Sequence, residues 1–523
     1  MDFSATADLI RSGRKPAFSD LSRQHAQSLD ECDPIRHLRD EYIFPTRASL
    51  KGRALRPVTS SPAATAADGT AHAASGQDRE DKDRDREDKD VEDKDGEDKD
   101  GEDKDGAIYF CGNSLGLQCR ATRRYIGAQL DTWASIGVNG HFTDLEDSPL
   151  VNWQDMAAQC AAQSAGFMGA LASEIVYMNT LTTNIHLLLA AFYRPTEKRH
   201  KIILEWKPFP SDYYAIHSHM QWHGLDPARS MVEVWPAGET LHIPTSRVLA
   251  TIDEHADDTA LILLPGIQYY SGQLFDMATI TRHAQARGIV VGWDLAHAAG
   301  NVDLSLHEWN VDFAMWCTYK YINAGPGSIA GAFVHERHGR VEWAPAADGG
   351  DAQPRPVFRP RLSGWYGGDK SVRFQMAKQF QPTPGAGGFQ VGNPSALDLA
   401  ALSGALSMFD EAGFANLRDK SLVLTCYAEA ALNQILADEQ HAGTPAFTVA
   451  TPADPAQRGA QLSILLRDGL LDTVLDEFAR EGIVCDKRKP DVLRVAPVPM
   501  YNTFDEVWRF MEVLRRALGV PRR

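Results

Sequence analysis

The sequence predicts an α/β protein with a mostly parallel, doubly wound sheet and a smaller C-terminal α+β domain. Between residues 175 and 334, short apolar runs rich in β-branched residues alternate with segments of helical periodicity. This alternation is typical of parallel strands joined by crossover helices. After residue 395, strands expected at 462–466 and 492–496 stand among helices expected at 396–411, 470–481 and 504–518, which predicts the second domain.

Local patterns predict the individual elements of the large domain. An apolar run that ends in a turn signal predicts each strand, and apolar residues spaced three and four apart predict each helix. In chain order we expect helices at 121–136 and 156–168, a strand at 175–178, a helix at 185–193, strands at 201–206 and 261–264, a helix at 277–287, and strands at 289–291 and 311–317.

Composition limits the classes of function. The chain has 523 residues, of which 43% are hydrophobic, so it can form two or three packed domains. A net charge of -17 without basic clusters argues against a nucleic-acid partner. The seven cysteines form no C-x-x-C pair, which favours a reducing compartment. The chain start lacks a secretion signal, and no apolar run approaches the roughly 20 residues of a membrane span, so we expect a cytosolic protein without a membrane partner.

We expect four segments: an N-terminal arm at 1–50, a linker with an acidic E-D-K-D-G repeat at 51–106, a large domain at 107–394 and a small domain at 395–523. In the arm, Asp30 or Asp33 is expected to cap a short helix with Pro34 in its first turn. The repeat cannot bury enough apolar surface to fold, so we interpret it as a disordered insertion, with an interaction tail as the alternative.

An aspartate and a lysine, each at the end of an apolar run, carry the chemical prediction. Asp294 ends the run that begins at 289, and Lys320 leaves the next run into a Gly-rich loop. Ligands bind at the carboxyl ends of strands in such sheets. A pyridoxal phosphate site needs a lysine to form the Schiff base and an acid to keep the pyridinium nitrogen protonated. Lys320 and Asp294 fit these two roles, although a solvent-exposed lysine beside a helix-capping aspartate fits the bare pair as well.

Other polar residues follow the earlier strands. Thr182 opens the helix after the strand at 175–178, where hydroxyls and free amides suit a phosphate, although helix capping alone explains them equally well. Phe209 precedes Ser211 and Asp212 and is placed to lie on an aromatic ring. In the next helix His219 and His223 share a face, as in some metal sites, but no acid completes an H-E-x-x-H motif. We therefore expect no metal.

Six motifs stand in the order seen in kynureninases, and the resemblance covers nearly the whole chain outside 51–106. It implies the class V branch of the pyridoxal-phosphate fold type I enzymes, acting as homodimers with shared active sites. It also implies hydrolytic Cβ–Cγ cleavage of kynurenine, and preferentially of 3-hydroxykynurenine, to an anthranilate and alanine, within tryptophan catabolism and NAD biosynthesis. The motifs are G-N-S-L-G-L (112–117), F-P-S-D (209–212), D-L-A-H (294–297), T-Y-K-Y-I-N-A-G (318–325), S-G-W-Y-G (363–367) and R-V-A-P-V-P (494–499).

The resemblance assigns roles to positions of this chain. Lys320 resembles the Schiff-base lysine, Asp294 the pyridinium partner, and Tyr319 the tyrosine that reaches the phosphate and assists proton transfer. Further cofactor contacts implied by the resemblance are His297 beside the ring, Phe209 stacked on it with Pro210, Ser211 and Asp212 in the same turn, Leu181 and Thr182 at the phosphate, and Trp365 and Asn393 supplied across the dimer interface.

The substrate contacts and one departure also come from the resemblance. Arg494 resembles the arginine that holds the substrate α-carboxylate. Ser114, His141 and Asn393 resemble residues around the aromatic end of the pocket. Polar donors there would favour the 3-hydroxylated substrate, although the same residues are compatible with walls that tolerate both substrates. Where many animal members have a phosphate-contacting serine, this chain has Pro265, so one phosphate contact is in doubt.

Two alternatives remain open on the sequence. A class V aminotransferase or a cysteine desulfurase would share Asp294 and Lys320, but such relatives usually carry Gln in place of His297 and His in place of Tyr319. A binding protein that has lost its cofactor and acts through the acidic repeat is the other alternative. The presence of all the expected polar groups argues against it.

Overall fold

The computed structural model describes residues 2–53, 106–238, 240–345, 354–376, 378–439 and 444–522. Its contacts divide the chain into one unit formed by Met1–Phe44 and Ile108–Arg523, and a small unit, Pro45–Ala107. In the small unit α3 (Arg47–Lys51) is capped by the Thr46 side chain. Nearly all of the predicted acidic insertion lies outside the described residues. The predicted domain boundaries stay predictions.

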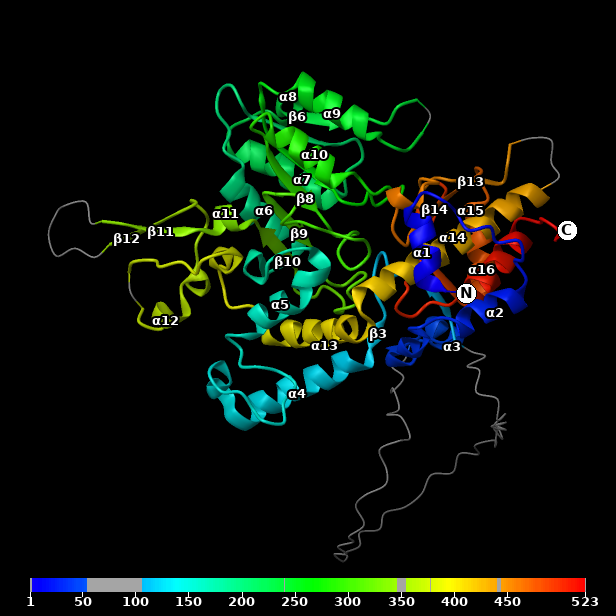
Figure 1. Ribbon diagram of the computed structural model, residues 1–523, viewed down its shortest axis with the longest axis horizontal. Helices are drawn as coiled ribbons and strands as arrows, with labels where there is room; N and C mark the ends of the chain where they lie inside the picture. Colours follow the sequence, from blue (N-terminus) through cyan, green and yellow to red (C-terminus); the bar gives the residue numbers. More distant parts are fainter. Residues whose placement is uncertain are drawn as a thin grey trace, which may run out of the picture. The chain divides into compact units, whose positions relative to one another are not determined.

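The larger unit contains a seven-stranded sheet that confirms the predicted α/β fold (Figure 1). Six strands are parallel, and β10 runs antiparallel to both of its neighbours, which the sequence patterns did not indicate. The strand order is β4 (Ile175–Tyr177), β10 (Gly331–Val334), β9 (Phe313–Trp316), β8 (Val290–Asp294), β7 (Thr259–Pro265), β5 (Lys201–Glu205) and β6 (Met231–Val234).

Alternate residues of these strands belong to two separate hydrophobic cores, as expected for a sheet covered on both faces. In β4, for example, Val176 packs in one core, while Ile175 and Tyr177 pack in the other. One core includes side chains of α6 (Leu181–Phe192) and α7 (Pro210–Trp222). The other includes side chains of α5 (Met156–Met168), α9 (Thr245–Glu254), α10 (Met277–Gln285) and α13 (Ala396–Ala412). The sheet is therefore doubly wound.

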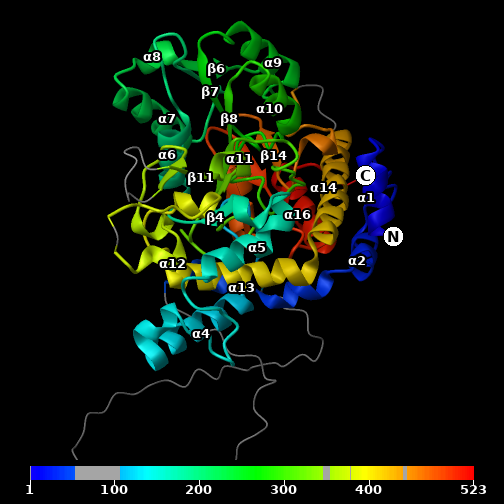
Figure 2. The same cartoon turned by 60° about the vertical axis from the view of Figure 1, so that its left-hand side comes forward.

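A second, five-stranded sheet has the order β13 (Phe447–Val449), β14 (Leu462–Leu466), β16 (Val492–Val495), β15 (Ile483–Arg488) and β2 (Ile108–Phe110). Only β2 pairs in parallel, and it comes from the segment that opens the predicted large domain. The core beneath this sheet joins both ends of the chain, since α1 and α2 lie beside α14 and α16 (Figures 1 and 2). Its helices are α1 (Phe3–Arg11), α2 (Arg23–Glu31), α14 (Phe414–Asp438), α15 (Leu471–Glu481) and α16 (Phe504–Ala517).

The short helix expected after Asp30 or Asp33 is present as the 3-10 helix Arg36–Glu41, which begins just after Pro34, and no side chain caps it. α2 begins after Ser22, whose side chain caps it, and ends at Glu31, before Pro34. The Asp33 carboxylate accepts the backbone N–H of Ile35 in a turn. Asp30 instead accepts two backbone N–H groups at the start of α16. Its capping role is tertiary, so local sequence could not reveal it.

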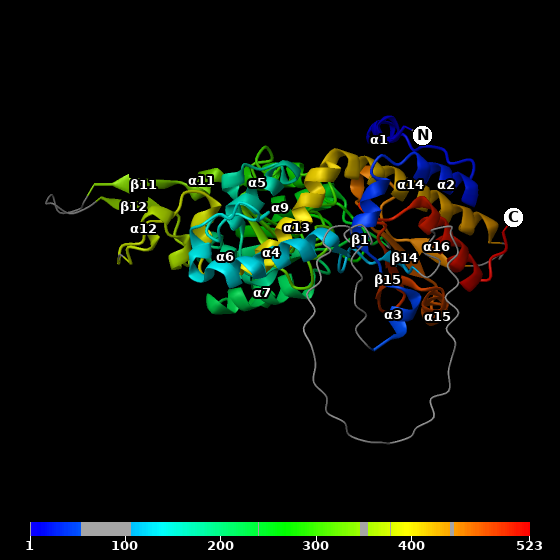
Figure 3. The ribbon, with the colours of Figure 1, turned by 90° about the horizontal axis from the view of Figure 1, so that it is seen from below.

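The remaining elements lie outside the two larger sheets. α4 (Arg120–Ile136) runs along α13 (Figure 1), and the β11–β12 hairpin and α12 lie together in Figure 3. Within the described ranges, no helix combines the length and the apolar character needed to cross a membrane. The other elements are β1 (Tyr42–Ile43), β3 (Gln118–Cys119), α8 (Pro227–Ser230), α11 (Glu336–Gly339), β11 (Val341–Ala344), β12 (Arg355–Phe358) and α12 (Lys370–Arg373).

Candidate active site

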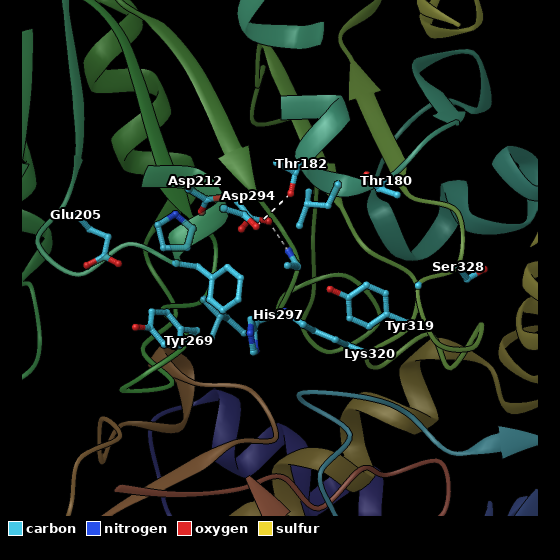
Figure 4. Close-up of a pocket in the computed structure, with 17 residues that line it drawn as sticks. Thr180, Thr182, Glu205, Asp212, Tyr269, Asp294, His297, Tyr319, Lys320 and Ser328 are labelled. Atoms are coloured by element: carbon cyan, nitrogen blue, oxygen red, sulfur yellow. Dashed lines mark hydrogen bonds between the residues drawn. The ribbon is translucent and has the colours of Figure 1, made fainter. Parts of the chain in front are cut away.

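A cavity lies at the carboxyl ends of the central parallel strands, where ligands bind in open α/β sheets (Figure 4). The sheet register explains part of its lining, because Pro265 at the end of β7 is paired with Asp294 at the end of β8. Ten predicted site residues line it: Leu181, Thr182, Phe209, Ser211, Asp212, Pro265, Asp294, His297, Tyr319 and Lys320. Seven more lining residues were not among the assigned site residues: Thr180, Glu205, Ile267, Tyr269, Ala296, Gly327 and Ser328.

Two buried carboxyl groups meet on one wall of the cavity. Asp294 accepts the backbone N–H of Ala296 at 2.8 Å. Burial raises the pKa of Asp294, and the positive charge of Lys320 only partly offsets this effect. Burial and the charge of Asp294 raise the pKa of Asp212 well above its usual value. Within the described chain, Asp212 Oδ1 is buried without a hydrogen-bond partner. Such an acid pair suits a ligand that brings a protonated nitrogen.

Lys320 and His297 face the same cavity. Both are at least nine-tenths buried, and Lys320 Nζ lies 5.8 Å from the ring centroid of Phe209. Burial lowers the pKa of His297 well below its usual value, and the charges of Lys320 and Arg494 lower it further. His297 is therefore a neutral ring in this site. Its Nδ1 has no hydrogen-bond partner among the described residues.

The first turns of α6 and α7 also line the cavity. No side chain caps the N-terminus of α6, and the Thr182 hydroxyl donates to the Ser211 hydroxyl at 3.1 Å. Uncapped helix starts present free backbone N–H groups and a positive end of the helix dipole, which favour a phosphate. Pro265 adds no donor. A helix-start anion site, a buried acid pair and a buried lysine together fit pyridoxal phosphate.

The loop containing Gly116 fixes the backbone around Lys320. The Gly116 N–H donates to the Tyr319 carbonyl at 2.8 Å. A Cβ atom at position 116 would lie 2.5 Å from the Lys320 carbonyl oxygen and 2.8 Å from Asn323 Cγ. Only glycine permits this approach, which gives the G-N-S-L-G-L motif a structural reason.

Six predicted residues do not line the cavity of this chain: Ser114, His141, Pro210, Trp365, Asn393 and Arg494. Arg494 lies directly behind a lining residue, because its Nη1 donates to the Tyr269 carbonyl at 2.8 Å. It is 1% exposed and forms an ion pair with Asp486. Arg494 Nε is buried and has no hydrogen-bond partner in the described part of the chain. That N–H is a hydrogen-bond donor without an acceptor among the described residues.

Trp365 and His141 belong to an aromatic surface. Trp365 is 46% exposed and packs on Phe374 with ring centroids 5.5 Å apart. Phe374 also contacts Phe142 at 5.2 Å, which follows His141 in the chain. Asn393 is exposed as well. Trp365 and Asn393 therefore face outward from the chain that carries them, whereas His141 is partly buried against Trp153.

Among the described residues, one group has metal-ligand spacing: Glu174, His307 and His335. Its carboxylate already accepts His307 Nδ1 at 3.0 Å and the backbone N–H groups of Leu171 and Glu336. These hydrogen bonds account for the cluster without an ion. The expected absence of a metal stays a prediction.

Sequence comparisons decide the family. Residues 151–451 match the aminotransferase class-V family, and residues 417–514 match the kynureninase C-terminal domain. Kynureninase 1 of Neurospora crassa is 56% identical over 99% of both chains. Kynureninase of Pyricularia oryzae is 58% identical over 94% of both. The chain belongs to the kynureninase family. As a class-V member it is a pyridoxal-phosphate-dependent enzyme, which confirms the predicted cofactor.

Solved structures show how widely this fold is shared. A C-DES mutant with glycine covalently linked to its PLP cofactor has a TM-score of 0.62 at 16% identity, covering 79% of this chain and 97% of that one. A cysteine desulfurase from Thermococcus onnurineus has a TM-score of 0.58 at 14% identity, covering 79% and 95%. At such identities the likeness concerns the fold alone. Membership in the kynureninase family, rather than the fold, separates this chain from the desulfurase alternative.

Proposed function

We propose that the chain hydrolyses the Cβ–Cγ bond of kynurenine, and preferentially of 3-hydroxykynurenine, to give the corresponding anthranilate and alanine. This step belongs to tryptophan catabolism leading to NAD. The observation that carries the proposal is one cavity that joins Lys320, the Asp294–Asp212 pair and the start of α6. The chain around it is more than half identical to kynureninases over nearly its whole length.

The chain's own residues have distinct tasks in this proposal. Bound pyridoxal phosphate supplies an electron sink, and Lys320 holds it and moves the substrate α-proton. Asp294 keeps the ring nitrogen protonated. Burial raises the pKa of Tyr319, so its hydroxyl stays protonated and serves as a donor and proton relay. The neutral His297 adds no charge next to the ring.

Arg494 is proposed to bind the substrate α-carboxylate. Asp486 and the Tyr269 carbonyl occupy two of its N–H groups, and Nε remains free. A guanidinium binds a carboxylate through two parallel N–H groups, so Nε and a neighbouring N–H are suited to this contact. Holding the carboxylate in this way fixes which substrate bond faces the cofactor.

We further propose a homodimer in which Trp365 and Asn393 complete the site of the partner subunit. Trp365, Phe374 and Phe142 form an exposed aromatic surface, and their exposed fractions are 46%, 43% and 59%. Exposed apolar surfaces of this kind are typical of protein interfaces. The proposed contacts of Ser114, His141 and Asn393 with the substrate ring stay predictions.

A turnover assay tests the reaction and the preference separately. Purified protein with added pyridoxal phosphate is given 3-hydroxykynurenine or kynurenine, and alanine and the fluorescent anthranilate are measured, with Lys320→Ala as the inactive control. Faster cleavage of the hydroxylated substrate supports both parts. Equal rates overturn the preference and keep the reaction. No cleavage of either substrate by cofactor-loaded protein overturns the proposal and favours aminotransferase or desulfurase chemistry.

A further inference from the structure

The loop between β7 and α10 is tied to the five-stranded sheet through three successive backbone carbonyls. Each carbonyl of residues 269–271 accepts a hydrogen bond from a different side chain of the C-terminal part. The donors are Arg494 Nη1 to Tyr269 at 2.8 Å, Ser463 Oγ to Tyr270 at 2.7 Å, and Thr451 Oγ1 to Ser271 at 2.7 Å. This loop therefore sets the position of Arg494 relative to the cavity, which Tyr269 lines.

Gln461 is at the centre of this connection. Its side chain is 1% exposed, and Nε2 donates to the Tyr269 carbonyl at 3.1 Å and to Ser463 Oγ at 2.9 Å. Its Oε1 accepts Asn113 Nδ2 at 2.9 Å, from the G-N-S-L-G-L loop. A carbonyl oxygen can only accept, so the atom of Gln461 that contacts the Tyr269 carbonyl must be Nε2, and the atom that contacts Asn113 must be Oε1. One buried amide thus joins three distant segments of the chain.

The Tyr269 carbonyl is shared between Gln461 and Arg494. Because both side chains donate to this one oxygen, a change in the direction of the carbonyl would move the guanidinium as well. Asp486 holds the guanidinium from another side, and the free Nε is left as a donor. Because a bidentate contact to a carboxylate has strict geometry, a small rotation of the guanidinium weakens it.

We propose that Gln461 is a positioning residue for Arg494, and that through the Tyr269 carbonyl it sets the affinity for the α-carboxylate of the substrate. Gln461 touches neither the cavity nor the reacting atoms. The inference rests on the proposed role of Arg494 in carboxylate binding. In this proposal the α-carboxylate of the substrate is recognised by Arg494 with the help of the buried Gln461 amide and the loop at residues 269–271.

Two substitutions at this position separate a lost hydrogen bond from an added charge. Gln461→Met keeps the side-chain volume and removes both donors. Gln461→Glu adds a carboxylate that repels the Tyr269 carbonyl and competes with substrate for Arg494. The exposed Gln457, four residues earlier, offers the matched control Gln457→Glu. Its side chain donates to Asp454 and, within the described part of the chain, forms no hydrogen bond with Tyr269 or Arg494.

With the pyridoxal-phosphate-loaded enzyme, we expect both Gln461 variants to raise KM for the preferred substrate, by about tenfold or more for Gln461→Glu, while kcat changes much less. The cofactor absorbance and the control Gln457→Glu should match the wild type. An unchanged KM in Gln461→Met overturns the inference. A fall in kcat as large as the rise in KM, the pattern of a general folding defect, overturns it too. If Gln461→Glu does not fold, Asn113→Ala removes the Oε1 partner from the other side and should raise KM in the same direction.

A binding measurement makes the result independent of turnover. The affinities of the loaded enzyme for L-alanine and for ethylamine, which lacks the carboxylate, are compared through changes in cofactor absorbance. We expect the wild type to favour alanine and Gln461→Met to lose most of this discrimination. Retained discrimination overturns the inference even if the wild type cleaves kynurenine. If Gln461→Met loses the discrimination while the wild type cleaves neither kynurenine nor 3-hydroxykynurenine, the inference is supported and only the proposed function is overturned.

Discussion

Replacing Gly116 by alanine is expected to displace the backbone at Lys320 and lower turnover about a hundredfold. The added Cβ would lie 2.5 Å from the Lys320 carbonyl oxygen, whereas such contacts essentially never fall below 3.0 Å. The two segments must therefore separate by roughly 0.5 to 0.9 Å. Asn323 cannot give way freely, because it is 1% exposed and held at a φ of 62°. A displacement of about 1 Å at a catalytic group costs on the order of a hundredfold in rate.

The assay for this variant is steady-state cleavage, read together with the cofactor absorbance and the melting temperature. Gly116 has no positive φ, so the effect is steric and not conformational. Gly166→Ala in α5 is the matched control: its Cβ meets no atom within 4 Å, and it should leave turnover unchanged while stabilising the helix by up to about 1 kcal/mol. Wild-type turnover in Gly116→Ala would refute the argument that this loop fixes Lys320.

Three further outcomes are expected. Burial raises the pKa of Glu205 from 4.5 to about 7, so the folded cofactor-free chain keeps a proton that the unfolded chain releases. The free energy of unfolding of this chain should therefore fall by up to about 3 kcal/mol as the pH rises from 4.5 to 7. Melting curves of Glu205→Gln should lack this part of the pH dependence. Burial alone would raise the pKa of Asp312, but hydrogen bonds, the strongest of them from His338, lower this pKa to about 2. The carboxylate should therefore add about 2 kcal/mol to the free energy of unfolding above pH 4, and this contribution is lost as the pH falls towards 2. Asp312→Asn should be less stable than the wild type at pH 7 but not in acid, and an equal melting temperature at pH 7 would contradict this. Mixing inactive Lys320→Ala with Trp365→Ala should recover about a quarter of wild-type activity. Half of the re-formed dimers contain one chain of each variant, and each of these mixed dimers has one complete site out of two. No recovery would place Trp365 in the site of its own chain.

The sequence predicted much of the candidate site because the chemistry follows the sheet. Asp294 and Lys320 each leave an apolar run, and parallel strands place their carboxyl ends at one edge. Glu205 and Tyr269 were missed for different reasons. Glu205 is the penultimate residue of the strand predicted at 201–206, but only its burial beside the cavity distinguishes it from an exposed acid. Tyr269 sits in a loop whose direction depends on contacts with the C-terminal sheet.

By itself the sequence determined many of the local elements, the doubly wound sheet and much of the set of residues gathered at the strand ends, because hydrophobic periodicity and motif order are local properties. Only the tertiary structure decided contacts between distant segments. It paired β2 with β15, placed Asp30 at the start of α16 and set Gln461 between Asn113 and Tyr269. A single buried hydrogen bond leaves no periodic trace in the chain, so its partner appears only when packing excludes water and leaves one partner within reach.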